Sequence, residues 1–315
     1  MSNVEVMVVL FAIVVVGYVT AKLGYLGGDF DRRLSSLVIR VTCPALILSS
    51  TMEGTFPDRH LILPLLSISF ITYVLLGLAA VLLPRVLTRR PDDRGVVGFA
   101  LMFGNVGFIG YPIVASIFGP EAVFYAAVLN VVNTFAVFTV GRMLLSSRSD
   151  GLPRTRRGWA RLMLSTPMLA AYLAMLIVAL DIDSVPVVVS RPLTLIGNIT
   201  VPAALLIIGS NMAQLSLRTM MGTATVYATA LFRLVLLPLA LHLLFSMTDF
   251  DEMAVNINTV VIAMPVATYG TIFSLRMGRD TTLITELTFV TTLISIVTIP
   301  ILAQLIMGRI SLFAM

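Results

Sequence analysis

Charged residues are scarce in this chain. Only 12% of its 315 residues are Asp, Glu, Lys or Arg, whereas 58% are hydrophobic. A soluble domain of this length needs a charged surface to stay dispersed, and this composition does not supply one. Apolar stretches of roughly 20 residues, the length that crosses a bilayer as a helix, recur along the sequence. The composition therefore predicts an all-α integral membrane protein that lies largely in lipid.

Residues that carry chemistry are also few. Cys43 is the single cysteine, which excludes a disulfide framework and a thiolate metal cluster. The two histidines, His60 and His242, lie far apart in sequence and are more readily explained as helix-end or packing residues. No H-E-x-x-H or G-x-S-x-G motif and no cluster of carboxylates is present, so an enzyme is not expected. We expect no catalytic residue, metal, cofactor or nucleic-acid partner. A receptor without transport would need a signalling domain, and the loops are too short for one.

Ten apolar stretches are long enough to be spans. The first carries Glu5 but no basic leader, unlike a signal peptide, and we interpret it as a retained span. Gly and Pro in the short connections at 118–121 and 276–280 predict tight helical hairpins. We place the spans at 4–23, 34–52, 61–83, 95–117, 121–145, 161–180, 192–213, 218–246, 253–275 and 281–308.

Charge alternates from loop to loop. Most of the 21 basic residues fall in the loops after the odd-numbered spans, and the even-numbered loops carry acids instead. Short cytoplasmic loops retain Lys and Arg. This pattern predicts a multi-pass protein of the bacterial inner membrane with its N- and C-termini outside, in the periplasm, which requires an even number of spans.

The two halves of the chain resemble each other. RLSSLVIRVTCPA at 33–45 aligns without gaps to RPLTLIGNITVPA at 191–203, matching an Arg and a Thr-x-Pro-Ala element. These segments lie five spans apart, and an odd number of spans inverts the second half. We therefore predict an N-terminal five-span repeat (1–145), a cytoplasmic linker (146–160) and an inverted C-terminal five-span repeat (161–315). A repeat kept only for packing is the alternative.

Helix-breaking residues gather in corresponding spans of the two halves. The fourth span contains GNVGFIGYP at 104–112 and the ninth contains IAMPVATYG at 262–270. Broken helices are tolerated in a membrane only inside protein or beside a watery cavity, and paired breaks indicate a transport site. Half-helix N-termini there would favour an anion, and unwound carbonyls would favour Na⁺. A simple proline kink is the alternative. The candidate substrate-binding residues are Asn105, Gly107, Gly110, Tyr111, Pro112, Met264, Pro265 and Thr268.

Polar and charged residues within the other spans add candidates. Asn130 and Asn133 share a helix face, for substrate contact or for interhelical hydrogen bonding. Arg40, Arg233 and Glu286 are the charges that lie more than a turn from the ends of a span, where ionisable residues are costly. Arg40 and Glu286 lie at similar depth and are expected to pair, or Glu286 to serve as a proton or sodium site. Arg233 faces an anion path or snorkels.

Several of these motifs together resemble the auxin efflux carrier family, in its bacterial branch. The resemblance covers essentially the whole chain. It rests on GNVGFIGYP followed by Phe118-Gly119-Pro120-Glu121, the paired Thr-Cys-Pro and Thr-Val-Pro elements, Ala263-Met264-Pro265, and the closing span with Thr291-Thr292-Leu293-Ile294-Ser295 and Pro300.

This resemblance implies a fold similar to that of bile-acid symporters and sodium–proton antiporters. In that fold spans one, two, six and seven form a scaffold, and the other six form a transport domain in which spans four and nine cross. Asn105, Pro112 and Pro265 match the family's residues at the breaks. The central loop is short here, so regulation through a long loop does not carry over.

The expected function is secondary transport of a small organic anion, such as a carboxylate or an auxin-like acid, by alternating access. Na⁺ or H⁺ would be the coupling ion, and a homodimer would form through the scaffold. A sodium-coupled bile-acid-type symporter is the alternative.

Overall fold

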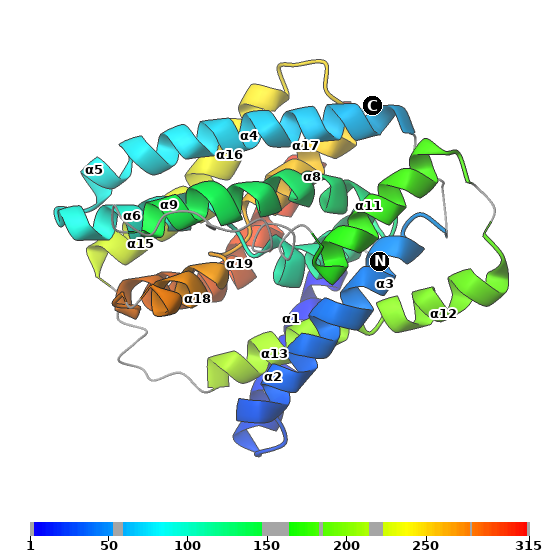
Figure 1. Cartoon of the computed structure of the whole chain (residues 1–315), viewed down its shortest axis with the longest axis horizontal. Coiled ribbons are helices and arrows are strands. Elements are labelled where there is room, and N and C mark those ends of the chain that lie inside the picture. The colour runs from blue at the N-terminus through cyan, green and yellow to red at the C-terminus, as the bar shows by residue number, and fades with distance from the viewer. Residues whose placement is uncertain are drawn as a thin grey trace. The chain divides into compact units, whose positions relative to one another are not determined.

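The computed structural model describes residues 3–52, 59–146, 164–182, 185–213, 223–277 and 279–313 (Figure 1). In these ranges the protein consists of helices joined by turns and short extended segments. Most of the predicted linker and the first residues of the sixth and eighth predicted spans lie outside these ranges. The longer helices are α1 (Asn3–Lys22), α2 (Gly28–Leu37), α3 (Cys43–Ser49), α4 (Ile62–Leu82), α6 (Arg94–Met102), α7 (Tyr111–Phe118), α8 (Ala122–Ala136), α11 (Thr166–Ala179), α12 (Val187–Gly197), α13 (Thr200–Ala213), α15 (Ala224–Leu231), α16 (Leu237–Phe245), α17 (Glu252–Ile262), α18 (Tyr269–Arg276) and α19 (Thr282–Phe313).

Short elements complete the chain between these helices. Two are four-residue α-helices, two are 3₁₀ turns and four are π-helical turns. They are α5 (Pro84–Leu87), α9 (Arg142–Leu145), η2 (Arg59–Leu61), η3 (Pro91–Asp93), η1 (Val38–Thr42), η4 (Val106–Gly110), η5 (Val137–Gly141) and η6 (Phe232–Leu236).

Five helical stretches are long and apolar enough to cross a membrane, and shorter apolar helices accompany them. This confirms the predicted all-helical, multi-pass membrane protein, while the number of ten spans and the inverted repeat stay predictions. The hairpin after α7 also forms as predicted, because Gly119 ends that helix with a φ of 99° and α8 begins three residues later. The five stretches are Ile62–Leu87, Ala122–Leu145, Val187–Ser210, Ala224–Phe245 and Thr282–Ile306.

Three of the four π-helical turns end two residues before a proline, namely Pro44, Pro112 and Pro238. Proline has no N–H to donate to the carbonyl four residues back, and its ring collides with that carbonyl. Widening the preceding turn by one residue avoids the collision and lets the helix continue. Within these helices proline therefore widens a turn and does not end the helix.

The chain divides into two compact units. Unit 1 contains the four spans that the family resemblance assigns to a scaffold, together with Val106–Val128, which the resemblance assigns to the transport domain. Unit 1 comprises Met1–Leu65, Val106–Val128 and Leu164–Ser216, and unit 2 comprises Leu66–Asn105, Leu129–Met163 and Leu217–Met315.

Unit 1 is built on the close packing of α1 against α13 (Figure 1). A Cβ added to Gly17 would overlap the backbone of Leu206, and one added to Gly209 would overlap the backbone of Val14. Small residues allow this approach in membrane proteins, where van der Waals packing holds helices together. Glycine at these two positions therefore sets the distance between the two helices.

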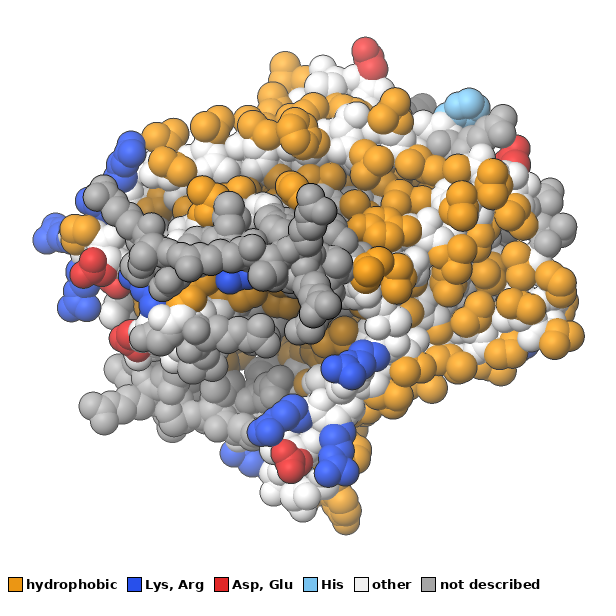
Figure 2. Space-filling model, in the orientation of Figure 1, with side chains coloured by type: hydrophobic (Ala, Val, Ile, Leu, Met, Phe, Trp, Pro, Cys, Tyr) orange, Lys and Arg blue, Asp and Glu red, His pale blue; other side chains and the backbone are white. Residues whose placement is uncertain are grey.

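Apolar side chains face outward on both units. In unit 2 the exposed residues Phe70, Val74 and Leu78 follow one side of α4, and in unit 1 Val187 and Val188 begin α12. Figure 2 shows hydrophobic side chains along both helices, with Lys and Arg gathered near α5 and α2. Exposed apolar helix faces of this kind are expected where lipid is the solvent.

Candidate functional site

The two predicted breaks meet within unit 2. The chain leaves helical geometry at Phe103–Asn105, after α6, and again at Ala263–Thr268, after α17. Gly104 and Val266 form an antiparallel bridge. The Asn105 N–H donates to the Pro265 carbonyl at 2.8 Å, and the Ala267 N–H donates to the Phe103 carbonyl at 3.0 Å. We call this pairing the crossover. It satisfies backbone groups that helix breaks would otherwise leave unpaired in a low-dielectric interior.

The break in the fourth span is shorter than the sequence suggested. Only Phe103–Asn105 is extended, whereas η4 and α7 continue as helix through the rest of the GNVGFIGYP motif. Pro112 lies where η4 continues into α7, and the wide turn of η4 avoids the clash with its ring. Pro265, in contrast, lies within the extended segment between α17 and α18. The two prolines of the motif pair therefore have different local roles.

Glycine is required at the centre of the crossover. A Cβ added to Gly104 would overlap the guanidinium of Arg233 and approach the Met264 Cβ to 3.1 Å and its carbonyl oxygen to 3.2 Å. These neighbours are buried, with Met264 at 0% exposure. Any larger residue would push the two extended segments apart.

Arg233 holds the crossover together. Its side chain is 1% exposed, its Nε donates to the Met264 carbonyl at 3.1 Å and its Nη1 donates to the Leu101 carbonyl at 3.0 Å. Leu101 lies in the last turn of α6, and Met264 follows the end of α17. Carbonyls at helix C-termini lack partners and carry partial negative charge, so a cation there is favoured. The sequence marked Arg233 as a costly charge but gave no sign that backbone carbonyls would be its partners.

Thr291 adds a third support for the crossover. Its Oγ1 accepts a hydrogen bond from the Val266 N–H at 3.0 Å and donates to the Leu287 carbonyl at 2.6 Å within α19. Sequence reasoning used Thr291 only as part of the family pattern. Its side chain was not a candidate because threonine within an apolar helix usually bonds its own backbone.

The candidate residues Pro265, Thr268 and Asn105 at the crossover differ in how exposed their side chains are. Pro265 is buried, Thr268 is exposed and Asn105 is partly exposed. The Asn105 backbone is fixed by its bond to Pro265, and its carboxamide makes no hydrogen bond within the described part of the chain. A polar side chain on a fixed backbone is thus available at the crossover.

Asn130 and Asn133 share a face of α8 and bond to each other there, whereas the sequence suggested substrate contact or interhelical hydrogen bonding. The Asn133 Nδ2 donates to the Asn130 Oδ1 at 2.7 Å, and both side chains are 7% exposed. The Asn133 Oδ1 is buried and accepts no hydrogen bond from a described residue. Asn133 therefore presents an unused acceptor inside unit 2.

The other candidates of the fourth-span break belong to unit 1. Gly107 accepts a weak hydrogen bond from the Cys43 thiol, at 3.6 Å, and a Cβ added there would meet open space. Gly110, Tyr111 and Pro112 are buried. Their role in binding stays a prediction.

Arg40 and Glu286 lie in different units. Arg40 is exposed on η1 in unit 1, and Glu286 is half-buried on α19 in unit 2. Their predicted pairing and the predicted role of Glu286 as an ion site stay predictions.

A buried acid that the sequence did not single out lies in unit 1. Asp31, 6% exposed on α2, accepts a hydrogen bond from the Ser210 hydroxyl of α13 at 2.6 Å and another from the Gly27 N–H at 3.0 Å. Asp31 precedes the second predicted span, so the search for charges within spans passed over it. It joins α2 to α13.

Comparison with known proteins places this architecture among transporters. The sequence pattern of the family described as membrane transport protein matches residues 2–303. An uncharacterized transporter of Methanothermobacter thermautotrophicus is 27% identical, with 96% of this chain and 97% of that protein covered. An uncharacterized transporter of Methanocaldococcus jannaschii is 22% identical, with 95% and 97% covered. A protein named "Putative malonate transporter" of Rhizobium meliloti is 22% identical, with 94% and 93% covered.

These matches extend over nearly the whole chain, and their names are those of membrane transporters and not of enzymes. They confirm the resemblance that the helix-break motifs indicated. This chain belongs to the auxin efflux carrier family of membrane transport proteins.

Proposed function

We propose that the protein is a secondary active transporter that moves a small organic anion across the bacterial inner membrane by alternating access, with the crossover in contact with its substrate. Membership of a transporter family supports the general activity. A relative named as a malonate transporter supports a carboxylate as the substrate class. The crossover supports the location, because broken helices that meet within a membrane protein are where transporters bind their cargo.

The main evidence for an anionic substrate is the buried charge of Arg233. Its guanidinium bonds only to carbonyls, and the one ion pair between described residues joins Arg32 to Asp29 elsewhere. A buried cation without a carboxylate partner leaves a positive potential around it, which is strong where the dielectric is low. An anion that approaches Asn105, the residue after Gly104, would enter that potential.

The Asn105 carboxamide supplies the polar contact in this proposal. Its Nδ2 donates to a substrate carboxylate, while the bond from its backbone to Pro265 keeps the side chain in place. Met264, Pro265 and Thr268 belong to the adjacent segment of the crossover. Further candidates for substrate contact are Gly107, Gly110, Tyr111, Pro112, Asn130 and Asn133.

Transport by purified protein in liposomes tests the proposal. Vesicles loaded with unlabelled acid are mixed with traces of labelled malonate, malate, indole-3-acetate or taurocholate. At least one carboxylate is expected to accumulate by counterflow above the level of protein-free vesicles. If no acid of the panel is exchanged, an organic-anion carrier is excluded for these substrates.

Replacing Asn105 tests its place in the site. Asn105→Ala is expected to lower counterflow at least about tenfold, the effect of losing one or two hydrogen bonds to a charged group. Expression and melting temperature should stay near those of the wild type, because the backbone bond to Pro265 is retained. Wild-type transport by Asn105→Ala would remove this residue from the site.

A sodium-coupled symporter of bile-acid type is the second candidate. The buried, unused Asn133 Oδ1 favours it, since amide and backbone carbonyl oxygens coordinate Na⁺ in broken-helix transporters. Uptake of taurocholate that requires external Na⁺ and is lost in Asn133→Leu would select this candidate. Equal rates in Na⁺ and K⁺ media exclude it, and a dependence on the pH gradient instead would identify H⁺ as the coupling ion.

The arrangement in the membrane completes the proposal. The basic loops lie in the cytoplasm and both termini outside, the ten spans form two inverted repeats, and the scaffold spans form a homodimer. The alternation of basic and acidic loops supports the orientation. Cysteines introduced singly in a Cys43→Ser background and labelled from one side of the membrane would test it.

A further inference from the structure

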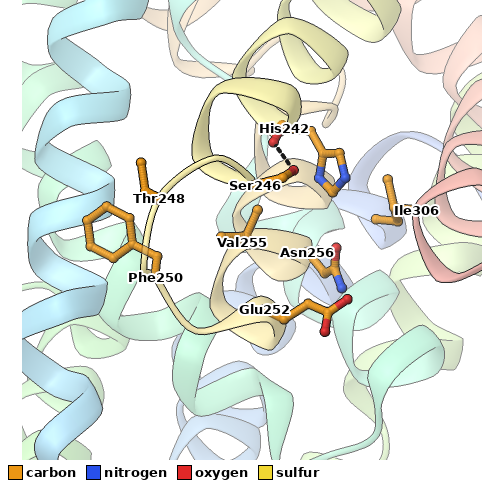
Figure 3. Close-up of a pocket in the computed structure, with 8 residues that line it drawn as sticks. All are labelled: His242, Ser246, Thr248, Phe250, Glu252, Val255, Asn256 and Ile306. Carbon is orange, nitrogen blue, oxygen red and sulfur yellow. Dashed lines mark hydrogen bonds between the residues drawn. The ribbon is translucent and has the colours of Figure 1, made fainter. Parts of the chain in front are cut away.

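A cavity of about 320 Å³ lies in unit 2 where α16 ends and α17 begins, beside α19 (Figure 3). It is separate from the crossover, because the crossover adjoins the C-terminal end of α17 and the cavity adjoins its N-terminal end. Its volume is at the lower end of the range for small-molecule sites. The residues that matter for recognition are His242, Phe250, Glu252, Val255, Asn256 and Ile306.

Asn256 presents an unused hydrogen-bond donor to this cavity. The side chain is 2% exposed, and its Nδ2 is buried without a partner among the described residues. Figure 3 shows the carboxamide directed into the cavity between His242 and Glu252. A buried amide donor is normally paired, so a site of this kind calls for a ligand with an oxygen acceptor.

The opening of the cavity is acidic. Glu252 is exposed at the start of α17, and its carboxylate points to the same side of the cavity as the Asn256 carboxamide (Figure 3). Asp249 and Asp251 precede it in the connecting loop, and no Lys or Arg is among the described residues that line the cavity. Carboxylates close together attract cations and repel anions, which excludes the anion proposed for the crossover.

His242 is held in place by a hydrogen bond to Thr259. The Thr259 hydroxyl donates to the Val255 carbonyl at 2.8 Å, so it accepts from the Nδ1–H of His242 at 3.1 Å. The polar side chains of the cavity are thus the Glu252 carboxylate, the Asn256 carboxamide, the His242 imidazole, and the Ser246 and Thr248 hydroxyls, which donate to backbone carbonyls.

The other walls are apolar. Phe250, Val255 and Ile306 supply an aromatic ring and two branched side chains (Figure 3). A metal ion would leave these walls unused. Moreover, no three His, Cys, Asp or Glu residues gather as metal ligands anywhere in the described ranges. The lining instead fits a short carbon chain with a polar group at each end.

We propose that this cavity binds a small organic ammonium ion that also carries a hydroxyl or carbonyl oxygen. The ammonium group bonds to Glu252. The oxygen accepts from the Asn256 Nδ2, and the carbon chain packs on Phe250, Val255 and Ile306. This site does not depend on the transported substrate, so it stands or fails apart from the proposed function.

Direct binding to the purified full-length protein in detergent tests the proposal. Three probes with the same number of non-hydrogen atoms are compared by isothermal titration calorimetry: 5-aminopentan-1-ol, n-hexylamine and pentane-1,5-diol. The amino alcohol is expected to bind most tightly, and the uncharged diol at least about tenfold more weakly, a difference of about 1.4 kcal/mol. Hexylamine should fall between them because it lacks the oxygen for Asn256.

Two variants and a matched control assign the contacts. Glu252→Gln is expected to lower the affinity for the amino alcohol at least about tenfold. Asp249→Asn removes an acid of the preceding loop that does not line the cavity, and it should change this affinity less than about twofold. Asn256→Leu should bind the amino alcohol and hexylamine equally. Melting temperatures of all three variants near that of the wild type show that they fold.

Three results would overturn the proposal. The first is that none of the probes binds the wild-type protein. The second is that Glu252→Gln binds the amino alcohol as the wild type does. The third is that Zn²⁺ alone binds, depends on Glu252 and His242, and is not displaced by the amino alcohol.

Discussion

Two close backbone contacts in this protein depend on glycine, but they use it for different purposes. In unit 1, Gly17 and Gly209 let the uninterrupted helices α1 and α13 touch. In unit 2, Gly104 lets two extended segments touch, and the buried charge of Arg233 completes their hydrogen bonding. The first contact needs only space, whereas the second needs space and a cation. We infer that the first serves packing and the second serves transport.

Removing the charge of Arg233 is expected to give the largest effect that distinguishes the crossover from the α1–α13 contact. Arg233→Met keeps much of the side-chain volume but leaves the Leu101 and Met264 carbonyls unpaired, at a cost of about 1–3 kcal/mol for each. We expect a lower melting temperature and transport per folded protein reduced at least about tenfold, because the segment that carries Asn105 is no longer held in position. Counterflow and thermal unfolding in detergent measure both effects.

Arg233→Lys is the control for a purely electrostatic role. Lysine keeps the positive charge but is a point donor that does not reproduce the planar fork reaching both carbonyls. Partial recovery of stability with little recovery of transport is expected. Full recovery of both would show that charge alone matters at the crossover and that the two hydrogen bonds do not.

Enlarging the glycines compares the two contacts directly. Gly104→Ala and Gly17→Ala both force a Cβ into occupied space, and overpacking typically costs about 1–3 kcal/mol. Gly104→Ala is expected to lower the transport rate per folded molecule. Gly17→Ala should lower the amount of folded protein and the total transport in the same proportion, so that its rate per folded molecule stays unchanged. Equal behaviour of the two variants, measured as counterflow per folded molecule, would contradict the distinction between packing and transport contacts.

The smallest effect is expected outside both contacts, at the start of α19. The hydroxyl and backbone N–H of Thr282 hold the pKa of the exposed Asp280 below its ordinary value of 3.8. The stability that Asp280 adds is therefore present above that ordinary pKa and is lost as the pH falls through the lowered one. The melting temperatures of wild type and Asp280→Asn should differ slightly at neutral pH and converge in acid, with transport unchanged. A difference that persists below the lowered pKa would argue against this interaction.

Much of the helical framework was predictable, because apolar length and turn residues act locally. The helices α1, α4 and α17 each begin within one residue of a predicted span start. The hairpin at Gly119 forms where Gly and Pro indicated it. The paired breaks were also predictable, since helix-breaking residues gather at 104–112 and at 262–270.

The partners that complete the breaks were not predictable from the sequence. The contacts of Arg233 with Leu101 and Met264 join residues more than 30 positions apart along the chain, and no local pattern encodes them. The fourth-span break is shorter than its run of Gly and Pro indicated, because a π-helical turn accommodates Pro112 within the helix. Asp31 was missed because its partner Ser210 comes from a distant helix.

Substrate protection at the crossover tests the central claim most directly. Cys43 is the single cysteine, so Cys43→Ser provides a background in which Thr268→Cys and the loop control Asp92→Cys are each labelled with a maleimide. Both positions are exposed. With a variant that still transports, the carboxylate identified by counterflow should slow labelling of Thr268→Cys and leave Asp92→Cys unchanged. Equal labelling of Thr268→Cys with and without saturating carboxylate would contradict substrate binding at the crossover.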